Sequence, residues 1–317
     1  MLKGKIMIYL LSDLNSDDII EISDWEVVRQ RENFHENVDL KDKKLFKIIG
    51  SYELQDKRTC GITSCHKAHN RGYIVATEDG IETNIGNDCG FKYFNVAFND
   101  LTNSFLRNLK NEQRKLSLFK AIAKIPEWRK KADLLKEGEF NIDWAIKNIE
   151  LIKNPSVIGR YASTELKRMA STSTTKVTIS RVASKKEADI QEVFDRKYAE
   201  SEEQTVEVAI GSVEHVDCLL EQNDLRQAFY MSVTKVMKEL MFCDPSTMSS
   251  PAMAKLVLKV NNIEFNLNFS SERLDAARRF LKKENLQPIY DKMYQMDIVS
   301  RSDLQRYSNF INCLPAK

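Results

Sequence analysis

Glycine and proline are scarce in this sequence. Its 317 residues include ten glycines and six prolines. A fold built from many short strands needs turn residues wherever the chain reverses, and glycine and proline are concentrated in such turns. The shortage therefore favours long helices over a loop-rich all-β fold.

Long hydrophobic runs are missing as well. A membrane-spanning helix needs about 18 to 20 consecutive apolar residues, and no stretch of the sequence approaches that length. The apolar run at residues 6–11 is short, and Ser12 and Asp13 follow it rather than the small residues of a signal-peptide cleavage site. We interpret this run as a first β-strand.

The motifs of the common enzyme classes are also absent. The sequence contains no G-x-x-x-x-G-K-[ST], G-x-G-x-x-G, G-x-S-x-G or H-E-x-x-H, and no H-x-E with P-C-x-x-C of the zinc deaminases. His35 and His215 stand alone, so neither belongs to a recognisable catalytic group. No catalytic residue is assigned, and the sequence gives no reason to interpret the chain as an enzyme.

Composition and length bound the fold class. Hydrophobic residues make up 42% of the chain, charged residues 30%, and the formal net charge is +2. These values predict a folded protein with a highly charged surface, and the length allows two or three domains at roughly 100–200 residues each. We expect a mostly helical α+β protein. Its expected parts are a strand-and-helix segment (1–55), a zinc finger with its following helix (56–109), a basic helical segment (110–170), a linker (171–205) and a C-terminal α+β domain (206–317).

Several elements of the N-terminal half follow from periodicity. We expect strands over 5–11 and 45–54, with a short helix between them that begins at Ser16-Asp17-Asp18. Asp79-Gly80 between two β-rich runs predicts a hairpin over 72–85. Helices are expected to follow it. An apolar stripe at spacings of three and four predicts the first of these helices (Phe91, Phe94, Phe98, Leu101, Phe105, Leu109). Four more helices are expected over 116–125, 127–136, 142–153 and 158–170.

The C-terminal part also predicts mixed structure. A helix is expected over about 213–241, and a hairpin over 255–269 with its turn at Asn261-Asn262. Further helices are expected to begin at Ser270 and at Ser302-Asp303. Within the linker, the alternation around Val177 fits one edge strand.

Three of the six cysteines are clustered with two histidines. The spacing is Cys60-x4-Cys65-x3-His69-x19-Cys89. In a chain without an export signal such a cluster indicates a metal rather than disulfides, and hence a reducing, cytoplasmic compartment. Thiolates and imidazole suit the tetrahedral preference of zinc, so we expect one structural Zn²⁺ on these four residues. His66 competes with His69, but adjacent residues such as Cys65 and His66 rarely bind one ion together.

Glycines and the order of elements support the metal site. Gly61 follows the first cysteine, and Gly86 and Gly90 bracket the last, where tight turns present amide groups to sulfur. The predicted order of elements over residues 58–109 is a turn, a hairpin, a second turn and a helix. This order resembles that of the treble-clef and zinc-ribbon fingers. That resemblance implies a closed, structural zinc. A hairpin and helix beside His66 also resemble nucleases of the HNH type, but the matching His/Asn pair is missing from the following helix.

A basic segment follows the finger. Ten basic and three acidic residues give residues 107–136 a charge of +7. A solvated helical face is one interpretation, and contact with nucleic-acid phosphates is the other. On the second interpretation, the expected contacts to DNA or RNA are Arg107, Lys110, Arg114, Lys115, Lys120, Lys124, Arg129, Lys130 and Lys131.

An acidic segment leaves the type of partner open. Residues 198–224 carry eight acidic residues and no Lys or Arg. This segment either stays solvated or folds onto the basic segment, within one chain or across a homodimer. Two functions are therefore carried forward. The first is a zinc-stabilised, non-enzymatic nucleic-acid-binding accessory protein, and the second is a protein-binding adaptor or inhibitor in which zinc only stabilises the fold.

Overall fold

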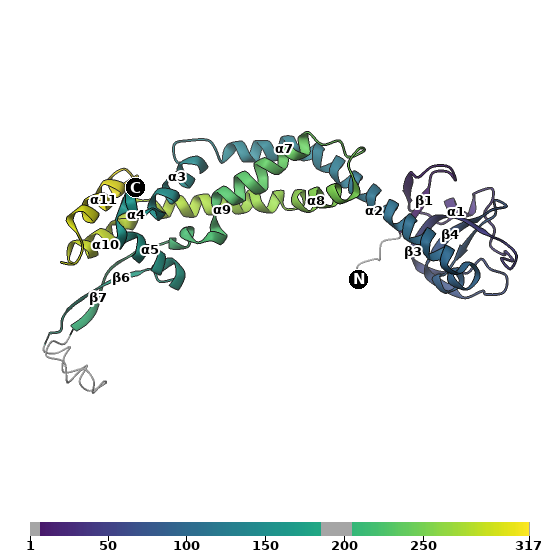
Figure 1. The fold of residues 1–317 in the computed structure, drawn as a ribbon, viewed down its shortest axis with the longest axis horizontal. Helices are drawn as coiled ribbons and strands as arrows, with labels where there is room; N and C mark the ends of the chain where they lie inside the picture. The colour runs from purple at the N-terminus through teal and green to yellow at the C-terminus, as the bar shows by residue number, and fades with distance from the viewer. Residues whose placement is uncertain (1–6, 185–204, 317) are drawn as a thin grey trace, which may run out of the picture. The chain divides into compact units, whose positions relative to one another are not determined.

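The computed structural model describes residues 7–184 and 205–316. The protein is a mostly helical α+β protein, as the sequence predicts (Figure 1). Its chain forms two compact units. Unit 1 comprises residues 1–120 and 244–257, and unit 2 comprises residues 121–243 and 258–317.

Unit 1 is built on one antiparallel sheet of five strands. The strand order is β2-β1-β3-β4-β5, and every neighbouring pair is antiparallel. The predicted strands near the N-terminus and the hairpin around Gly80, whose φ is +85°, are confirmed. The strands are β1 (Met7–Leu11), β2 (Ile19–Ile22), β3 (Leu45–Thr59), β4 (Ala68–Thr77) and β5 (Glu82–Ile85).

The helix predicted to begin at Ser16 is wrong. The Asp13 carboxylate accepts hydrogen bonds from the backbone amides of Asn15 and Ser16, which fixes a turn here instead of a helix start. The apolar residues that follow the turn pair with β1 as strand β2. The helix of this region comes later and is short, α1 (Glu26–Arg29).

The core of unit 1 lies between the sheet and the start of the long helix α2 (Asn87–Leu134). Phe94, Phe98, Phe105 and Leu109 are buried, as the periodicity of the sequence predicts. Phe91 is exposed, and the helix is interrupted at Asn95, where φ is 51° and ψ is −131°. The stripe therefore begins one turn later than the sequence pattern indicates.

Helix α2 also joins three helices that the sequence analysis separates, over 91–109, 116–125 and 127–136. Pro126 lies inside it, and the chain remains helical on both sides. Ile125 and Trp128, on either side of the proline, are both buried, so packing holds both turns although the proline donates no hydrogen bond.

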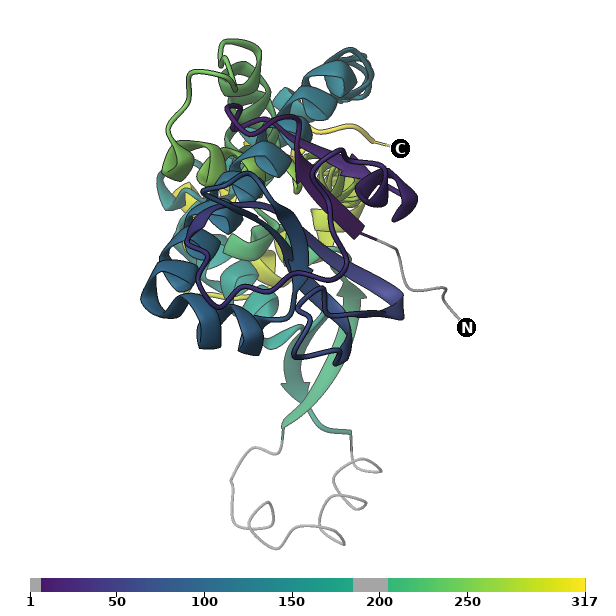
Figure 2. The ribbon, with the colours of Figure 1, turned by 90° about the vertical axis from the view of Figure 1, so that its right-hand side faces the viewer.

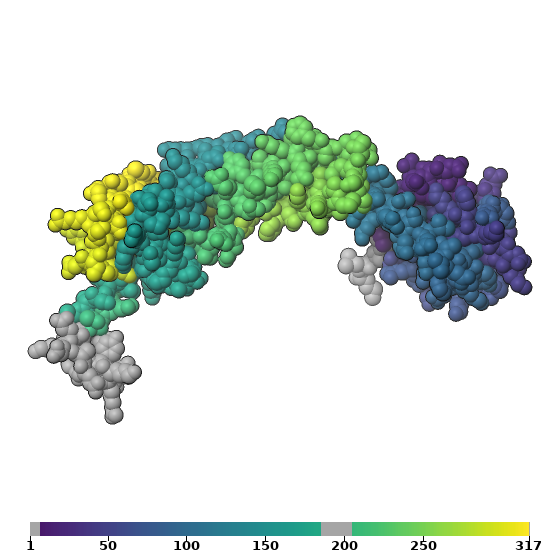
Figure 3. Space-filling model, in the orientation of Figure 1, coloured from purple at the N-terminus to yellow at the C-terminus, as the bar shows by residue number. Residues whose placement is uncertain are grey.

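Unit 2 contains most of the helices. The predicted helix over 142–153 is confirmed. The Asn141 side chain caps it by accepting a hydrogen bond from the backbone amide of Trp144. In the space-filling view the C-terminal helices (yellow) pack on the teal helices of the same unit (Figure 3). The helices of this part are α3 (Ile142–Lys153), α4 (Pro155–Ile158), α5 (Arg160–Thr172), α10 (Lys283–Tyr294) and α11 (Arg301–Asn312).

A two-stranded hairpin belongs to unit 2. Strand β6 (Lys176–Val182) lies within the predicted linker and pairs antiparallel with β7 (Thr205–Ser212). Figures 1 and 2 both show this hairpin extending from the helices of unit 2. The remainder of the predicted linker, residues 185–204, lies outside the described residues.

The hairpin predicted over 255–269 is wrong, because this segment is helical. Helix α8 (Ser250–Val260) and helix α9 (Ile263–Phe280) are joined at Asn261-Asn262. Leu256, Val260, Ile263 and Leu267 are buried, and their spacing of three and four is that of one helix face. Packing of this face overrides the turn preference of the two asparagines.

The single helix predicted over 213–241 is also wrong. The chain there forms two 3₁₀ turns, η2 (Val216–Leu219) and η3 (Glu221–Asn223), and then the π-helix η4 (Arg226–Thr234). Helix α7 (Lys235–Met241) completes the segment. Across the described residues, none of the helices combines the length and the apolar character that crossing a membrane requires.

Candidate metal centre

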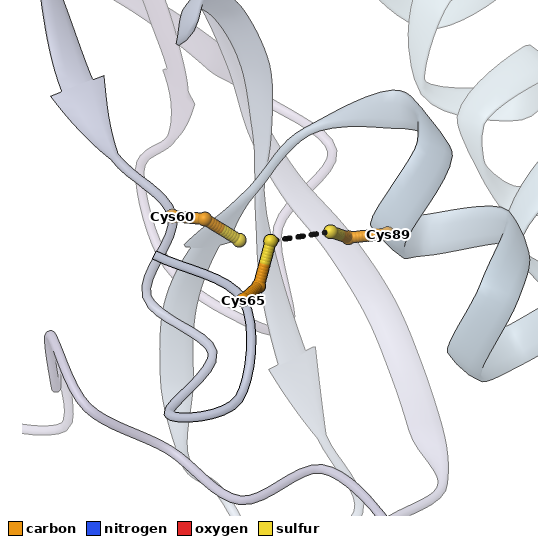
Figure 4. A group of neighbouring side chains, drawn as sticks. All are labelled: Cys60, Cys65 and Cys89. Carbon is orange, nitrogen blue, oxygen red and sulfur yellow. Dashed lines mark hydrogen bonds between the residues drawn. The ribbon is translucent and has the colours of Figure 1, made fainter. Parts of the chain in front are cut away.

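Three cysteine side chains converge at the start of α2. Cys60 follows β3, Cys65 ends the loop before β4, and Cys89 lies in the first turn of α2. Their Sγ atoms all lie within 4.8 Å of one another, and Figure 4 shows the three sulfur atoms pointing toward a common centre. The clustering predicted from the spacing is therefore confirmed, and these three residues can hold a metal ion.

Backbone hydrogen bonds fix the loop that carries the first two thiols. The amide of Cys60 donates to the carbonyl of Lys67 at 2.9 Å, and the amide of Cys65 donates to the carbonyl of Ile62 at 3.0 Å. Gly61 is needed in this loop because a Cβ there would lie 2.0 Å from the Thr83 hydroxyl oxygen. The loop is thus held in shape by protein contacts as well as by any bound ion.

Backbone amides also point at the sulfur atoms. The amides of Ile62 and Gly86 hydrogen-bond the Cys60 sulfur, and the amide of Lys67 hydrogen-bonds the Cys65 sulfur. Such N–H groups stabilise thiolates and orient them toward a metal. The Lys67 amide is the main reason that the pKa of Cys65 is lowered.

Burial acts in the opposite direction on the other two thiols. It raises the pKa of Cys60, and it raises the pKa of Cys89 to about 12. A cation among the three sulfur atoms would reverse this effect, because thiols that coordinate a metal lose their protons.

The distances between the sulfur atoms suit metal ligands and are too long for a disulfide bond. The Sγ atoms of Cys65 and Cys89 are 3.2 Å apart, whereas a disulfide bond is about 2.05 Å long. Tetrahedral zinc with Zn–S bonds of about 2.3 Å places its sulfur ligands about 3.8 Å apart. A group of three thiols within 4.8 Å can close around such an ion with small side-chain adjustments.

His69 lies beside this group but is not part of it. Its ring packs against Gly86, where a Cβ would lie 3.4 Å from His69 Nε2. Its Nδ1 lies 3.0 Å from the Tyr52 hydroxyl, while its Nε2 is buried without a hydrogen-bond partner among the described residues. Burial lowers the pKa of His69, which favours the neutral ring that a metal requires. His66 is exposed and has a φ of 51°.

The basic segment is partly neutralised by its own neighbours. Lys115 pairs with Glu112 at 2.6 Å, and Lys131 pairs with Glu127 at 2.7 Å. Lys124 pairs with Glu264 at 2.9 Å, and Glu264 also accepts the indole N–H of Trp128. These cations are therefore less available to a partner than the sequence implies.

Other predicted cations form no ion pair with the described residues, although Arg114 is half-buried. Arg114 donates to the side chains of Asn111 and Ser250, and Arg129 lies against the Met241 sulfur. Four cations have neither a hydrogen bond nor an ion pair with any residue in 7–184 or 205–316. They are Arg107, Lys110, Lys120 and Lys130.

The acidic segment is used in part within unit 2. Asp217 forms an ion pair with Arg273 of α9 at 2.8 Å, so this carboxylate is engaged locally. Residues 198–204 of the segment lie outside the described residues.

Two parts of the site were not found from the sequence. Tyr52 is 17 residues from His69 along the chain, and only the pairing of β3 with β4 brings the two together. The amides of Ile62 and Gly86 carry no side-chain signal, although the glycine itself was noted beside the last cysteine.

Comparison with protein-family models, with curated proteins and with solved structures gives no match. The resemblance to treble-clef fingers therefore rests on the order of elements around the cysteines alone.

Proposed function

We propose that this chain is a zinc-stabilised, non-enzymatic nucleic-acid-binding protein. The observation that carries the proposal is the convergence of Cys60, Cys65 and Cys89 at the start of a helix whose later turns present cations with no partner in residues 7–184 or 205–316. Zinc fixes the beginning of this helix against the sheet. The cations beyond it then contact phosphates.

Zinc is the metal that the ligand chemistry favours. Three thiolates form a soft ligand set, which selects zinc, copper(I) or iron–sulfur clusters over magnesium or calcium. Amide donors around single sulfur atoms and a neighbouring neutral imidazole suit one closed tetrahedral ion. Such a closed site stabilises the fold and leaves no position for a reacting water.

His69 is the proposed fourth ligand. Its Nδ1–H would donate to the Tyr52 hydroxyl, which leaves the lone pair on Nε2, the buried nitrogen without a partner. Ligating histidines commonly donate their other N–H in this way. Coordination would require the ring to move toward the thiols, and the absence of a side chain at Gly86 leaves space beside the ring.

The choice of histidine is tested by two matched substitutions. His69→Ala is expected to weaken zinc binding by about tenfold or more, whereas His66→Ala leaves it unchanged. Zinc affinity is measured by competition with a chelator of known affinity. Cobalt substitution gives a second readout, because its visible spectrum reports four-coordinate Cys₃His ligation. If His66→Ala had the larger effect, His69 would not be the ligand.

The nucleic-acid part of the proposal is supported by the cations that pair with none of the residues that the structure describes. Arg107 and Lys110 are exposed and three residues apart, so they lie on neighbouring turns of α2. Both side chains carry charge that suits phosphate oxygens, and the tryptophan of the basic segment, Trp128, is buried and bonded to Glu264. Contact with phosphates, with little sequence selectivity, is the mode that these side chains support.

Salt dependence and two pairs of variants test this mode. Affinity for DNA or RNA should fall steeply with salt, with a log–log slope of about −0.9 for each phosphate contacted. The double variant Arg107→Ala/Lys110→Ala should reduce both the affinity and the slope. The matched control is Lys115→Ala/Lys131→Ala, which removes cations already paired with Glu112 and Glu127 and should have a smaller effect. Equal losses in both double variants would contradict the assignment.

A protein partner is the second candidate, and one observation favours it. Unit 2 exposes large apolar side chains, including Phe242 at 85%, Leu258 at 68% and Phe265 at 67% exposure. A pull-down with and without nuclease separates the two functions. A specific protein that is retained after nuclease treatment, without nucleic-acid affinity at low salt, would support the adaptor or inhibitor instead.

A further inference from the structure

A polar pocket in unit 1 contains a cation that has no partner among the described residues. The pocket has a volume of 230 Å³ and lies beside the end of β3. Its lining includes Trp25, Arg29, Glu36, Lys57 and Arg58. None of these residues belongs to the metal centre or to the basic segment of α2.

An irregularity in β3 places the two cations of this pocket. Glu53 pairs with Arg71, and the next pair is Arg58 with His69, so β3 has four residues between these pairs where β4 has one. The Asn70 side chain holds this bulge by donating to the carbonyls of Leu54 and Gln55 at 3.3 and 3.1 Å. Bulges of this kind redirect side chains and are common beside binding sites.

Arg58 is held in the pocket, and no carboxylate in the described part of the chain pairs with it. Its guanidinium carbon lies 5.8 Å from the centre of the Trp25 ring, and its Nε is buried without a hydrogen-bond acceptor among the described residues. A buried, unpaired donor of a charged group is costly unless a ligand satisfies it. Lys57 beside it is exposed and likewise forms no ion pair with residues 7–184 or 205–316.

The other cation of the pocket is already neutralised. Arg29 pairs with Glu36 at 2.6 Å and with Glu26 at 3.2 Å. This pairing leaves Arg58 and Lys57 as the unbalanced charges, so the pocket carries a net positive charge toward a ligand. The Glu36 carboxylate, in turn, disfavours ligands that place a second negative charge on its side of the pocket.

The aromatic residue of the pocket does not offer a stacking surface. Trp25 is 4% exposed, and Phe34 and Tyr52 pack edge to face against it. The arginine lies over its ring, so a base has no free indole face on which to stack. The pocket therefore has the donors that recognise an anion and lacks the surface that recognises a base.

We propose that this pocket binds a phosphate group, carried on a nucleic-acid strand or on a free nucleotide. Arg58 supplies a planar fork of donors that matches two phosphate oxygens, and Lys57 adds a mobile charge at the rim. The assignment to a nucleic-acid strand rests on the proposed function, whereas the phosphate chemistry stands on the pocket alone.

Binding of three probes to the full-length, zinc-loaded protein tests the proposal. The probes are inorganic phosphate, a nucleoside monophosphate and a single-stranded oligonucleotide, each titrated at low salt. Arg58→Ala should weaken binding of every probe that the protein binds by about tenfold to a hundredfold. Arg58→Lys should recover only part of the loss, because lysine keeps the charge without the fork.

A matched control keeps the charge change the same. Arg71 lies in the same unit, is 77% exposed and pairs with Glu53, so Arg71→Ala removes one positive charge away from the pocket. This variant should bind all three probes as the unmodified protein does. Zinc content and far-ultraviolet circular dichroism of each variant confirm that the sheet and the metal centre are intact.

The outcomes separate the two proposals. Oligonucleotide binding that Arg107→Ala/Lys110→Ala weakens but Arg58→Ala does not, with no affinity for phosphate, would overturn the pocket and leave the proposed function standing. Phosphate or nucleotide binding that Arg58→Ala abolishes, without oligonucleotide affinity, would support the pocket as a nucleotide site and end the nucleic-acid function. Equal losses in Arg58→Ala and Arg71→Ala would also overturn the pocket, because they would show a general effect of charge.

Discussion

Removal of zinc from the full-length protein is expected to unfold unit 1. The ion would join the loop after β3 to the first turn of α2, and no disulfide links these two elements, since all three cysteines are free. Structural zinc sites contribute about 10–16 kcal/mol in finger peptides. That is comparable to the total stability of a domain, about 5–15 kcal/mol. Chelation should therefore abolish hydrogen-exchange protection over residues 45–109. Elemental analysis of the protein before chelation should give about one zinc per chain.

Substitution of one thiol should have the same effect. Cys60→Ser is expected to lose zinc and to unfold the sheet, because Cys60 is fully buried and its sulfur accepts two backbone amides. The matched control is Cys313→Ser, which changes an exposed free cysteine in unit 2 and should retain both metal and stability. Purified protein without metal, or a chelated protein whose exchange is unchanged, would show that the three thiols do not form a structural site.

The thiol cluster was predictable because its signals are local. A short spacing between Cys60 and Cys65, and glycines on both sides of the last cysteine, restrict the loops that carry them. The fourth metal ligand was harder to predict from the sequence. Whether His69 approaches the thiols depends on the three-residue bulge in β3, and bulges leave no regular pattern in a sequence.

Helix and strand were confused where both patterns fit. The segment from Leu256 to Leu267 places apolar residues at spacings that suit a buried helix face, and its two asparagines suit a hairpin turn. Burial of the apolar face decided the outcome. Between Ser12 and Asp18, by contrast, side-chain hydrogen bonds to nearby amides favoured a turn over a helix cap.

The charge of the basic segment was correct from the sequence, but its availability was not. Lys124 is paired with Glu264, which is 140 residues away in the sequence. Only the packing of α9 in unit 2 reveals such a partner. Conversely, the unpaired Arg58 gave no signal in the sequence, because an isolated arginine next to a lysine is ordinary on a protein surface.

A buried carboxylate in unit 2 should govern the acid stability of that unit. Glu165 of α5 is 9% exposed and receives two hydrogen bonds from Arg168, at 2.9 and 3.0 Å. Lys292 of α10 donates a third at 2.8 Å, so this carboxylate joins two helices. These cations, with Arg168 the larger influence, hold the pKa of Glu165 at about 2, below the usual 4.5. The carboxylate is thus stabilised in its charged form by the fold.

The sign of the pH effect follows from this lowered pKa. The stabilisation is fully present above pH 4.5, the pKa of the unfolded chain, and is lost as the pH falls toward about 2. Its size is about 2–3 kcal/mol. Glu165→Gln should lower the free energy of unfolding of unit 2 by that amount at pH 7, measured by urea titration, and should flatten its decline between pH 4.5 and pH 2. Glu150→Gln, which breaks an exposed pair with Arg226, should change it by less than about 1 kcal/mol. A pH dependence that is identical in Glu165→Gln and the unmodified protein would mean that other carboxylates control acid unfolding.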